Sequence, residues 1–326
     1  MKIHRANVVE ELLKIYSQKG VHTEIQVSYI NEKGVDLDGL MKDLFFSFWD
    51  AVKYQYFTGE KEFVPRVGPD VRDDLFVIFG RILGDGYLAC GYLPLYLARP
   101  IYLLICGVDV ADSDILSSFL NLVSPSERNT LLEALKCENI FTTQVSVYEK
   151  VLSIFSRYGN RELPCASKLN DQVIQIAKCE IVLKTAYART KIMEGLCESP
   201  FYLNGNFLFN AVCQMQPTVS KVLKFLVIEE GLDEKADNVV DFFKLFIESS
   251  DGTTLAKLLR FISSTDALLG PIQVSFNSLI GNQRRITANT CSNTVHLPKS
   301  YGSYCEFAND LKAILNNPST WVFDSL

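Results

Sequence analysis

The sequence lacks the short motifs that mark most metal and cofactor chemistries. It has no Cys-x-x-Cys pair and no His-Glu-x-x-His, and its three histidines are scattered, so neither a structural zinc site nor a zinc protease is expected. No Gly-x-Ser-x-Gly nucleophile elbow occurs. The glycines of residues 80–86 lack the Lys-Ser/Thr ending of a phosphate-binding loop. We therefore expect no metal and no cofactor.

An excess of positive charge is also missing. The formal net charge is -6 over 326 residues, whereas proteins that bind nucleic acid concentrate Lys and Arg on one face. The sequence does not begin with positive charges followed by a short apolar stretch, so it does not predict a secretory signal. The most apolar region, residues 86–108, is interrupted by Pro94, Arg99 and Pro100, which favours buried helices over a membrane span. Neither nucleic acid nor a membrane is an expected partner.

Cysteine, in contrast, is plentiful. The chain has nine, an odd number without regular spacing, and several lie inside apolar runs, as Cys90, Cys106 and Cys213 do. This usage is typical of reduced core cysteines in a cytoplasmic or nuclear protein. Cys305, which follows Tyr304 in a helical pattern, is also predicted to pack in the core.

Hydrophobic periodicity predicts that the first two-thirds of the chain is mainly helical. A period-two pattern over residues 23–29 predicts one half-buried strand. Ser124 and Glu127 form a capping box with proline at the first helical position. The predicted helices cover residues 8–16, 40–57, 71–83, 128–136 and, as one long or kinked helix, 172–196.

A polar, glycine-containing segment, residues 229–235, separates two apolar stretches and predicts a domain boundary. We expect an N-terminal lobe over residues 1–230 and a small α/β lobe over residues 231–326, an α+β fold in all. The second lobe is predicted to contain helices over residues 238–247, 254–262 and 304–315 and a strand over residues 272–276. The alternative is an all-helical scaffold, in which residues 272–298 form no sheet.

Cys291 stands apart from the other cysteines because it lies on a short polar turn between two extended pieces. A thiol acts as a nucleophile only as the thiolate, which nearby cations and partial exposure favour. The alternative for Cys291 is a partly buried, unreactive thiol. The basic residues close to it in sequence are Arg284, Arg285, His296 and Lys299.

The stretch Ala288-x-Thr290-Cys291-x-Asn293-x-x-x-Leu297-Pro298 resembles the C-terminal lobe of the HECT ubiquitin ligases, which carry Leu-Pro-x-Ala-His-Thr-Cys-Phe-Asn-x-Leu-x-Leu-Pro. Two further matches occur in order: residues 258–262 are similar to the family's Leu-Leu-x-Phe-Val helix, and Phe323 is fourth from the end. Residues 27–40 resemble the family's N-terminal Val-x-Phe-x-Gly-Glu-x-Gly-x-Asp-x-Gly-Gly more loosely.

The resemblance implies a bilobed HECT-like fold and a ubiquitin-protein transferase. Cys291 would take ubiquitin as a thioester from a ubiquitin-conjugating enzyme and pass it to a lysine of a protein substrate. Exchange between thioesters is nearly thermoneutral, so a lone, well-placed cysteine suffices. The conjugating enzyme is expected to dock within residues 135–196. The residues expected to support Cys291 are Asn289, Thr290, Asn293, Phe323 and Asp324.

Asp38 replaces the second glycine of the family's N-terminal pattern. Three other departures favour an alternative: Asn289 replaces the family's histidine, Ser292 replaces its phenylalanine, and residues 156–164 of the docking region do not show the family's strand pair. An asparagine cannot carry the proton that an imidazole can. His296 lies five residues beyond the cysteine, where a strand would turn it away. The alternative is a catalytically weak or inactive module that binds ubiquitin or a conjugating enzyme without turnover.

Overall fold

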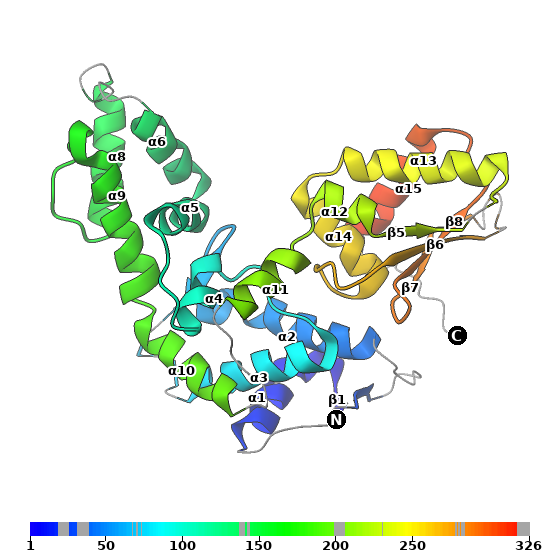
Figure 1. Ribbon diagram of the computed structural model, residues 1–326, viewed down its shortest axis with the longest axis horizontal. Helices are drawn as coiled ribbons and strands as arrows, with labels where there is room; N and C mark the ends of the chain where they lie inside the picture. Colours follow the sequence, from blue (N-terminus) through cyan, green and yellow to red (C-terminus); the bar gives the residue numbers. More distant parts are fainter. Residues whose placement is uncertain are drawn as a thin grey trace.

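The computed structural model has a mixed α/β fold, largely helical with small sheets, built around two hydrophobic cores (Figure 1). We call residues 1–215, which supply nearly all of the first core, the first unit, and residues 219–317 the C-terminal unit. The structure describes residues 1–18, 26–30, 39–66, 68–69, 71–72, 74–136, 141, 144–198, 206–229, 231–277, 279, 281 and 284–317.

The first unit is helical, with two small sheets. Its helices are α1 (Val8–Ser17), α2 (Gly39–Tyr56), α3 (Leu75–Cys90), α4 (Arg99–Ile105), α5 (Asp112–Leu122), α6 (Pro125–Lys136), α8 (Val145–Arg157), α9 (Leu169–Lys178), α10 (Ala186–Cys197) and α11 (Phe207–Met215). Strand β1 (Lys2–Ile3) pairs in parallel with β2 (Ser28–Tyr29), and β3 (Phe57–Gly59) pairs antiparallel with β4 (Phe63–Pro65).

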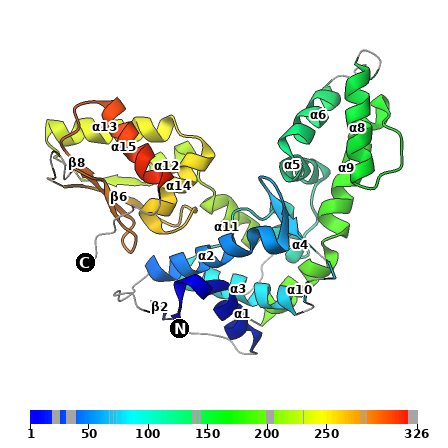
Figure 2. The ribbon, with the colours of Figure 1, turned by 180° about the vertical axis from the view of Figure 1, so that it is seen from behind.

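Two groups of elements rise from a common base formed by α1, α2, α3 and α10. One is an arm of helices α5, α6, α8 and α9, and the other is the C-terminal unit; the views in Figures 1 and 2 agree on this arrangement. The arm continues into the base because α9 and α10 are joined through the π-helix η3 (Cys179–Leu183). The helix predicted over residues 172–196 is therefore a helix interrupted by a π-turn.

Several elements can be compared with their sequence predictions. The predicted capping box is confirmed: the backbone N–H of Ser124 donates to Glu127 Oε2 over 3.0 Å, and the N–H of Glu127 donates to Ser124 Oγ over 3.3 Å. Helix α2 closely matches its predicted range, whereas α3 begins later than residue 71 and extends to Cys90. Of the strand predicted over residues 23–29, residues 23–25 lie outside the described residues and Ser28–Tyr29 form β2.

The C-terminal unit packs helices against a four-stranded sheet of order β5-β6-β8-β7, in which only the β7–β8 pair is antiparallel. Side chains alternate along β8 (Thr294–Pro298): Val295 and Leu297 are buried, and His296 lies on the other face. The remaining elements are α12 (Val219–Lys224), β5 (Leu226–Ile228), α13 (Glu234–Glu248), α14 (Gly252–Ser263), β6 (Ile272–Asn277), β7 (Thr287–Asn289) and α15 (Tyr304–Asn316).

This sheet bears on two of the sequence predictions. The all-helical alternative is wrong, because β6, β7 and β8 pair within residues 272–298. The expected boundary at residues 230 and 231 differs from the division of the cores. Strand β5 pairs with β6, and Val222 of α12 is buried in the second core, so the second core begins upstream of the polar segment that sequence composition marks.

The apolar region around residues 86–108 is divided between the end of α3, an extended segment and α4. Within the part of the chain that the structure describes, we find no helix with the length and apolar character needed to cross a membrane.

Candidate active site at the Cys291 turn

The Cys291 turn, residues 290–293, joins β7 to β8 at the edge of the sheet. The side chain of Asn289 organises it: its Oδ1 accepts the backbone N–H of Cys291 over 3.1 Å and that of Ser292 over 3.2 Å. Asn293 has a φ of 51°, the left-handed conformation that asparagine tolerates. Asn289 is buried and Cys291 is exposed, so the turn presents the thiol on a braced support.

Three of the four basic residues that flank Cys291 in sequence contact partners elsewhere. Arg284 forms ion pairs with Glu306 and Asp310 of α15, at 2.6 and 3.2 Å. Lys299 Nζ lies 2.7 Å from Asp233 Oδ2. His296 Nδ1 contacts Ser275 Oγ on β6. Proximity in sequence therefore does not gather these charges around the sulfur.

Helix α2 of the first unit supplies the neighbours that sequence reasoning missed. A Cβ placed on Gly39, the first residue of α2, would lie 2.8 Å from Thr290 Oγ1 and 3.1 Å from Cys291 Sγ. One turn further along, Lys42 Nζ donates to Asn293 Oδ1 over 3.2 Å. Both contacts join residues more than 200 positions apart in the chain, and local pattern carries no signal for such a pairing.

These contacts belong to one stripe of α2. The α2 stripe, defined as Gly39, Lys42, Asp43, Phe46 and Ser47, follows the i, i+3, i+4, i+7, i+8 spacing of a single helix face. Each of its members faces the C-terminal unit. The adjoining face carries Leu44, Phe45, Phe48, Trp49 and Val52 into the first core.

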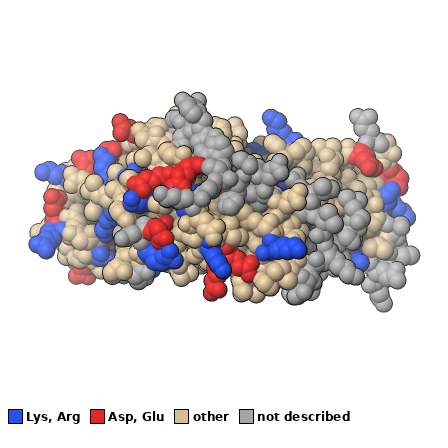
Figure 3. Space-filling model, turned by 90° about the horizontal axis from the view of Figure 1, so that it is seen from below, with Lys and Arg blue, Asp and Glu red and all other residues tan. Residues whose placement is uncertain are grey.

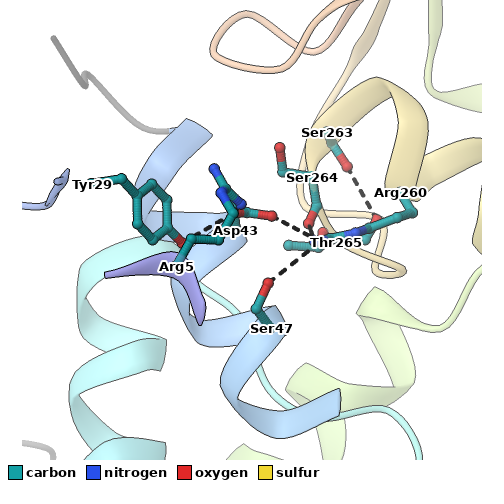
Figure 4. Close-up of polar contacts among 8 residues, drawn as sticks. All are labelled: Arg5, Tyr29, Asp43, Ser47, Arg260, Ser263, Ser264 and Thr265. Carbon is teal, nitrogen blue, oxygen red and sulfur yellow. Dashed lines mark hydrogen bonds and ion pairs between the residues drawn. The ribbon is translucent and has the colours of Figure 1, made fainter. Parts of the chain in front are cut away.

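Asp43 is the centre of a polar cluster between the two units (Figure 4). Its Oδ1 accepts from Arg260 of α14 over 2.8 Å, and its Oδ2 accepts from the Tyr29 hydroxyl over 3.0 Å and from Arg5. The guanidinium of Arg260 also lies 3.9 Å from the ring centroid of Phe46. Arg260 thus makes two contacts across the interface, an ion pair with Asp43 and a cation–π contact with Phe46.

The segment after α14 completes the junction. Ala267 is fully buried in the first core although it belongs to the C-terminal unit. The backbone N–H of Leu268 donates to the carbonyl of Met215 over 2.9 Å, and the Tyr92 hydroxyl donates to Asp266 Oδ1 over 3.2 Å. Burial raises the pKa of Asp266 to about 6, although the Tyr92 hydrogen bond and Arg260 favour its charged form.

Asp266 makes the junction pH-dependent. Its pKa in the folded protein is above the value of 3.8 for an unburied carboxyl, so its stabilising contribution is complete below that value and is lost as the pH rises through about 6. We expect Asp266 to lower the free energy of unfolding by about 2 kcal/mol between pH 4 and pH 8, after allowance for partial exposure. Urea unfolding of Asp266→Asn, with the natural protein as control, should show a flatter pH profile; an identical profile would contradict this assignment.

The structure also bears on Phe323, Asp324 and Cys305. Phe323 and Asp324, expected to support Cys291, lie outside the described residues. Cys305 is exposed on α15, so the prediction that it packs in the core is wrong. On the face seen in Figure 3, acidic and basic side chains are intermixed among the described residues.

Comparison with known proteins adds no family to this geometry. No family model matches the chain, and no curated protein matches it in sequence.

Proposed function

We propose that this protein is a bilobed, divergent HECT-type ubiquitin-protein transferase that uses Cys291 as its nucleophile. The observation that carries the proposal is the exposed thiol on a braced hairpin turn, which faces a different structural unit. A transferase of this kind needs a thiol that a bulky thioester can reach, on a body that can change neighbours. The resemblance around Cys291 supplies the substrate class, ubiquitin and its conjugating enzyme.

The proposed reaction has two steps that balance. The Cys291 thiolate attacks the carbonyl carbon of the ubiquitin thioester on the conjugating enzyme; a new C–S bond forms, the old one breaks, and the donor cysteine leaves as a thiolate. A substrate lysine amine then attacks the new thioester. The C–N bond forms, Cys291 leaves as a thiolate, and the amine proton passes to water.

A specific observation favours the alternative, a weak or inactive module that binds ubiquitin or a conjugating enzyme without turnover. Asn289 replaces the family's histidine, and its carbonyl oxygen accepts two backbone N–H groups of the turn. Arg284 and Lys299 are held by carboxylates. Under this alternative, the turn retains its shape as a recognition surface and Cys291 carries no thioester.

One assay separates the two. The protein is incubated with activating enzyme, conjugating enzyme, ATP and ubiquitin, and the products are resolved with and without reductant. We expect a reductant-sensitive ubiquitin adduct that disappears in Cys291→Ala and becomes reductant-resistant in Cys291→Ser, because an oxyester replaces the thioester. Cys305→Ala, which removes another exposed cysteine of the same unit, is the matched control and should keep the adduct.

The assay also has clear contrary outcomes. An adduct that persists in Cys291→Ala would assign the chemistry to another residue. Absence of any adduct, together with direct binding of ubiquitin or the conjugating enzyme, would establish the non-catalytic alternative.

A further inference from the structure

Lys42 occupies a position that the stability of its own helix does not explain. It lies in the opening turns of α2, where the positive end of the helix dipole disfavours a cation. It is also only 7% exposed, and burying an ammonium is costly unless it is hydrogen-bonded. Its side-chain hydrogen bond in the described structure goes to the Asn293 amide oxygen of the other unit. The hydrogen bond to the Cys291 turn explains why a buried lysine lies at the amino end of α2, a position that the helix dipole disfavours.

Gly39 shows how closely this turn approaches α2. With a Cβ at this position, the Thr290 hydroxyl and the Cys291 sulfur would both be nearer than most Cβ contacts allow. Gly39 and Lys42 are three residues apart, so they lie on the same side of the helix. Together they provide the space and the hydrogen bond that place the turn.

We propose that Lys42 is a positioning residue for Cys291: through Asn293 it holds the nucleophile's turn against the amino end of α2, and this contact serves the transfer from Cys291 to the acceptor amine. The inference rests on the proposed transferase function. Lys42 acts through Asn293 and takes no part in the bond changes, which are those of the second step above.

The arrangement of the units indicates that the Lys42–Asn293 contact serves the second step, the transfer of ubiquitin from Cys291 to the acceptor amine. The resemblance places docking of the conjugating enzyme within residues 135–196, which include α8, α9 and α10. In Figure 1 the hairpin that carries Cys291 points toward α2 in the base, while α8 and α9 stand in the separate arm. Cys291 can receive ubiquitin from a conjugating enzyme on the arm only when the C-terminal unit has moved away from α2. The Lys42–Asn293 contact therefore forms after the C-terminal unit, now carrying the thioester, has returned to α2.

The test measures the two steps separately in the full-length chain. Loading is followed as formation of the Cys291 adduct in a single turnover, and discharge is followed as loss of that adduct to free lysine. In Lys42→Met we expect discharge to slow about tenfold, because the turn loses its anchor, while loading stays within about twofold. Lys14→Met, which changes an exposed lysine of α1, is the matched control and should leave both rates unchanged.

A double-mutant cycle tests the partner. Asn293→Gly removes the amide and keeps a residue that accepts the positive φ. If Lys42 acts through Asn293, the double variant discharges no more slowly than either single variant. Additive effects, or an equal loss in loading and discharge, would overturn the proposal.

Gly39→Ala provides a second variant that does not weaken α2. Alanine has the higher helix propensity, yet its Cβ pushes the turn away from the helix. We expect the same selective slowing of discharge. Normal discharge from Gly39→Ala would mean that the docked contact plays no part in the reaction.

A measurement without ubiquitin distinguishes failure of this inference from failure of the proposed function. The rate at which iodoacetamide alkylates Cys291 is followed on its peptide by mass spectrometry, with Cys305 as the internal reference. Release of the turn exposes the thiol further, so alkylation in Lys42→Met and Asn293→Gly should rise about threefold. An unchanged rate would overturn the positioning role even if the adduct forms; a raised rate with no adduct would leave the positioning intact and refute the transferase function.

Discussion

Alanine at Gly195 is expected to unfold much of the first unit at physiological temperature. A Cβ at Gly195 would lie 2.0 Å from the carbonyl oxygen of Val77, and one at Gly80 would lie 2.1 Å from that of Ile192. The obstructing atoms belong to the backbone of the opposite helix, so no side-chain rotation relieves the clash. Helices α3 and α10 must separate, and the core between them opens.

The expected cost follows from what the two helices bury. Phe79 and Ile82 of α3 and Ile192 and Leu196 of α10 are among the least exposed residues of the first core. Overpacking of this kind costs about 1–3 kcal/mol even where a side chain can shift, so we expect a loss of more than about 3 kcal/mol against rigid backbone. The free energy of unfolding is measured by circular dichroism in urea.

Two comparisons make this prediction specific. Gly252→Ala places a methyl group in open space at the start of α14 and should change stability by less than about 0.5 kcal/mol. Gly80→Ala and Gly195→Ala should be less than additive in the double variant, because one separation of the helices relieves both clashes. A loss below about 1 kcal/mol in Gly195→Ala would show that the helices are not in close contact.

Elements with local signals were predictable from the sequence. The capping box at Ser124, the helical spacing after Asn7 and the alternation around Val274 each correspond to observed elements. Asn289 is expected from the sequence only to support Cys291, and in the structure its side-chain oxygen accepts two backbone N–H groups of the turn. Residue type revealed a polar role, and only the turn geometry revealed the direction of the hydrogen bonds.

The junction between the units was not predictable in the same way. Lys42, Asp43 and Ser47 form a polar stripe on an amphipathic helix, which is typical of a solvated face. The partners that bury it lie more than 200 residues away. The division between the two cores differs from the boundary expected from composition for a related reason. Residues 229–235 have the composition of a linker, but β5, which precedes them, pairs with β6 of the C-terminal unit. Long-range pairing overrides local composition.

Asp43→Ala should loosen the junction more than any other single change to the α2 stripe. Asp43 is 8% exposed and receives Arg260, Tyr29 and Arg5. Without its carboxylate, two guanidinium groups remain close together with no opposite charge between them, and removal of one partner of a buried pair costs more than the pair contributes. The side chain of Arg5 is 47% exposed, so solvent screens part of this repulsion. We expect a loss of about 2–3 kcal/mol in the free energy that holds the units together.

Amide hydrogen exchange gives the direct measurement, because it reports opening segment by segment. In Asp43→Ala, the start of α2 and residues 264–269 should exchange faster, while the core helices α3 and α10 keep their protection. Asp43→Asn, which keeps the shape and one acceptor oxygen, should show a smaller effect.

Arg260→Ala combined with Asp43→Ala should be less damaging than the sum of the two, since the unpaired cation is then removed as well. Uniform loss of protection over the whole chain would instead make Asp43 a determinant of global stability, and unchanged exchange at the junction would refute its role in docking. If the proposed function holds and the conjugating enzyme docks on the arm, Asp43→Ala should also leave adduct formation intact while discharge slows, as expected for Lys42→Met.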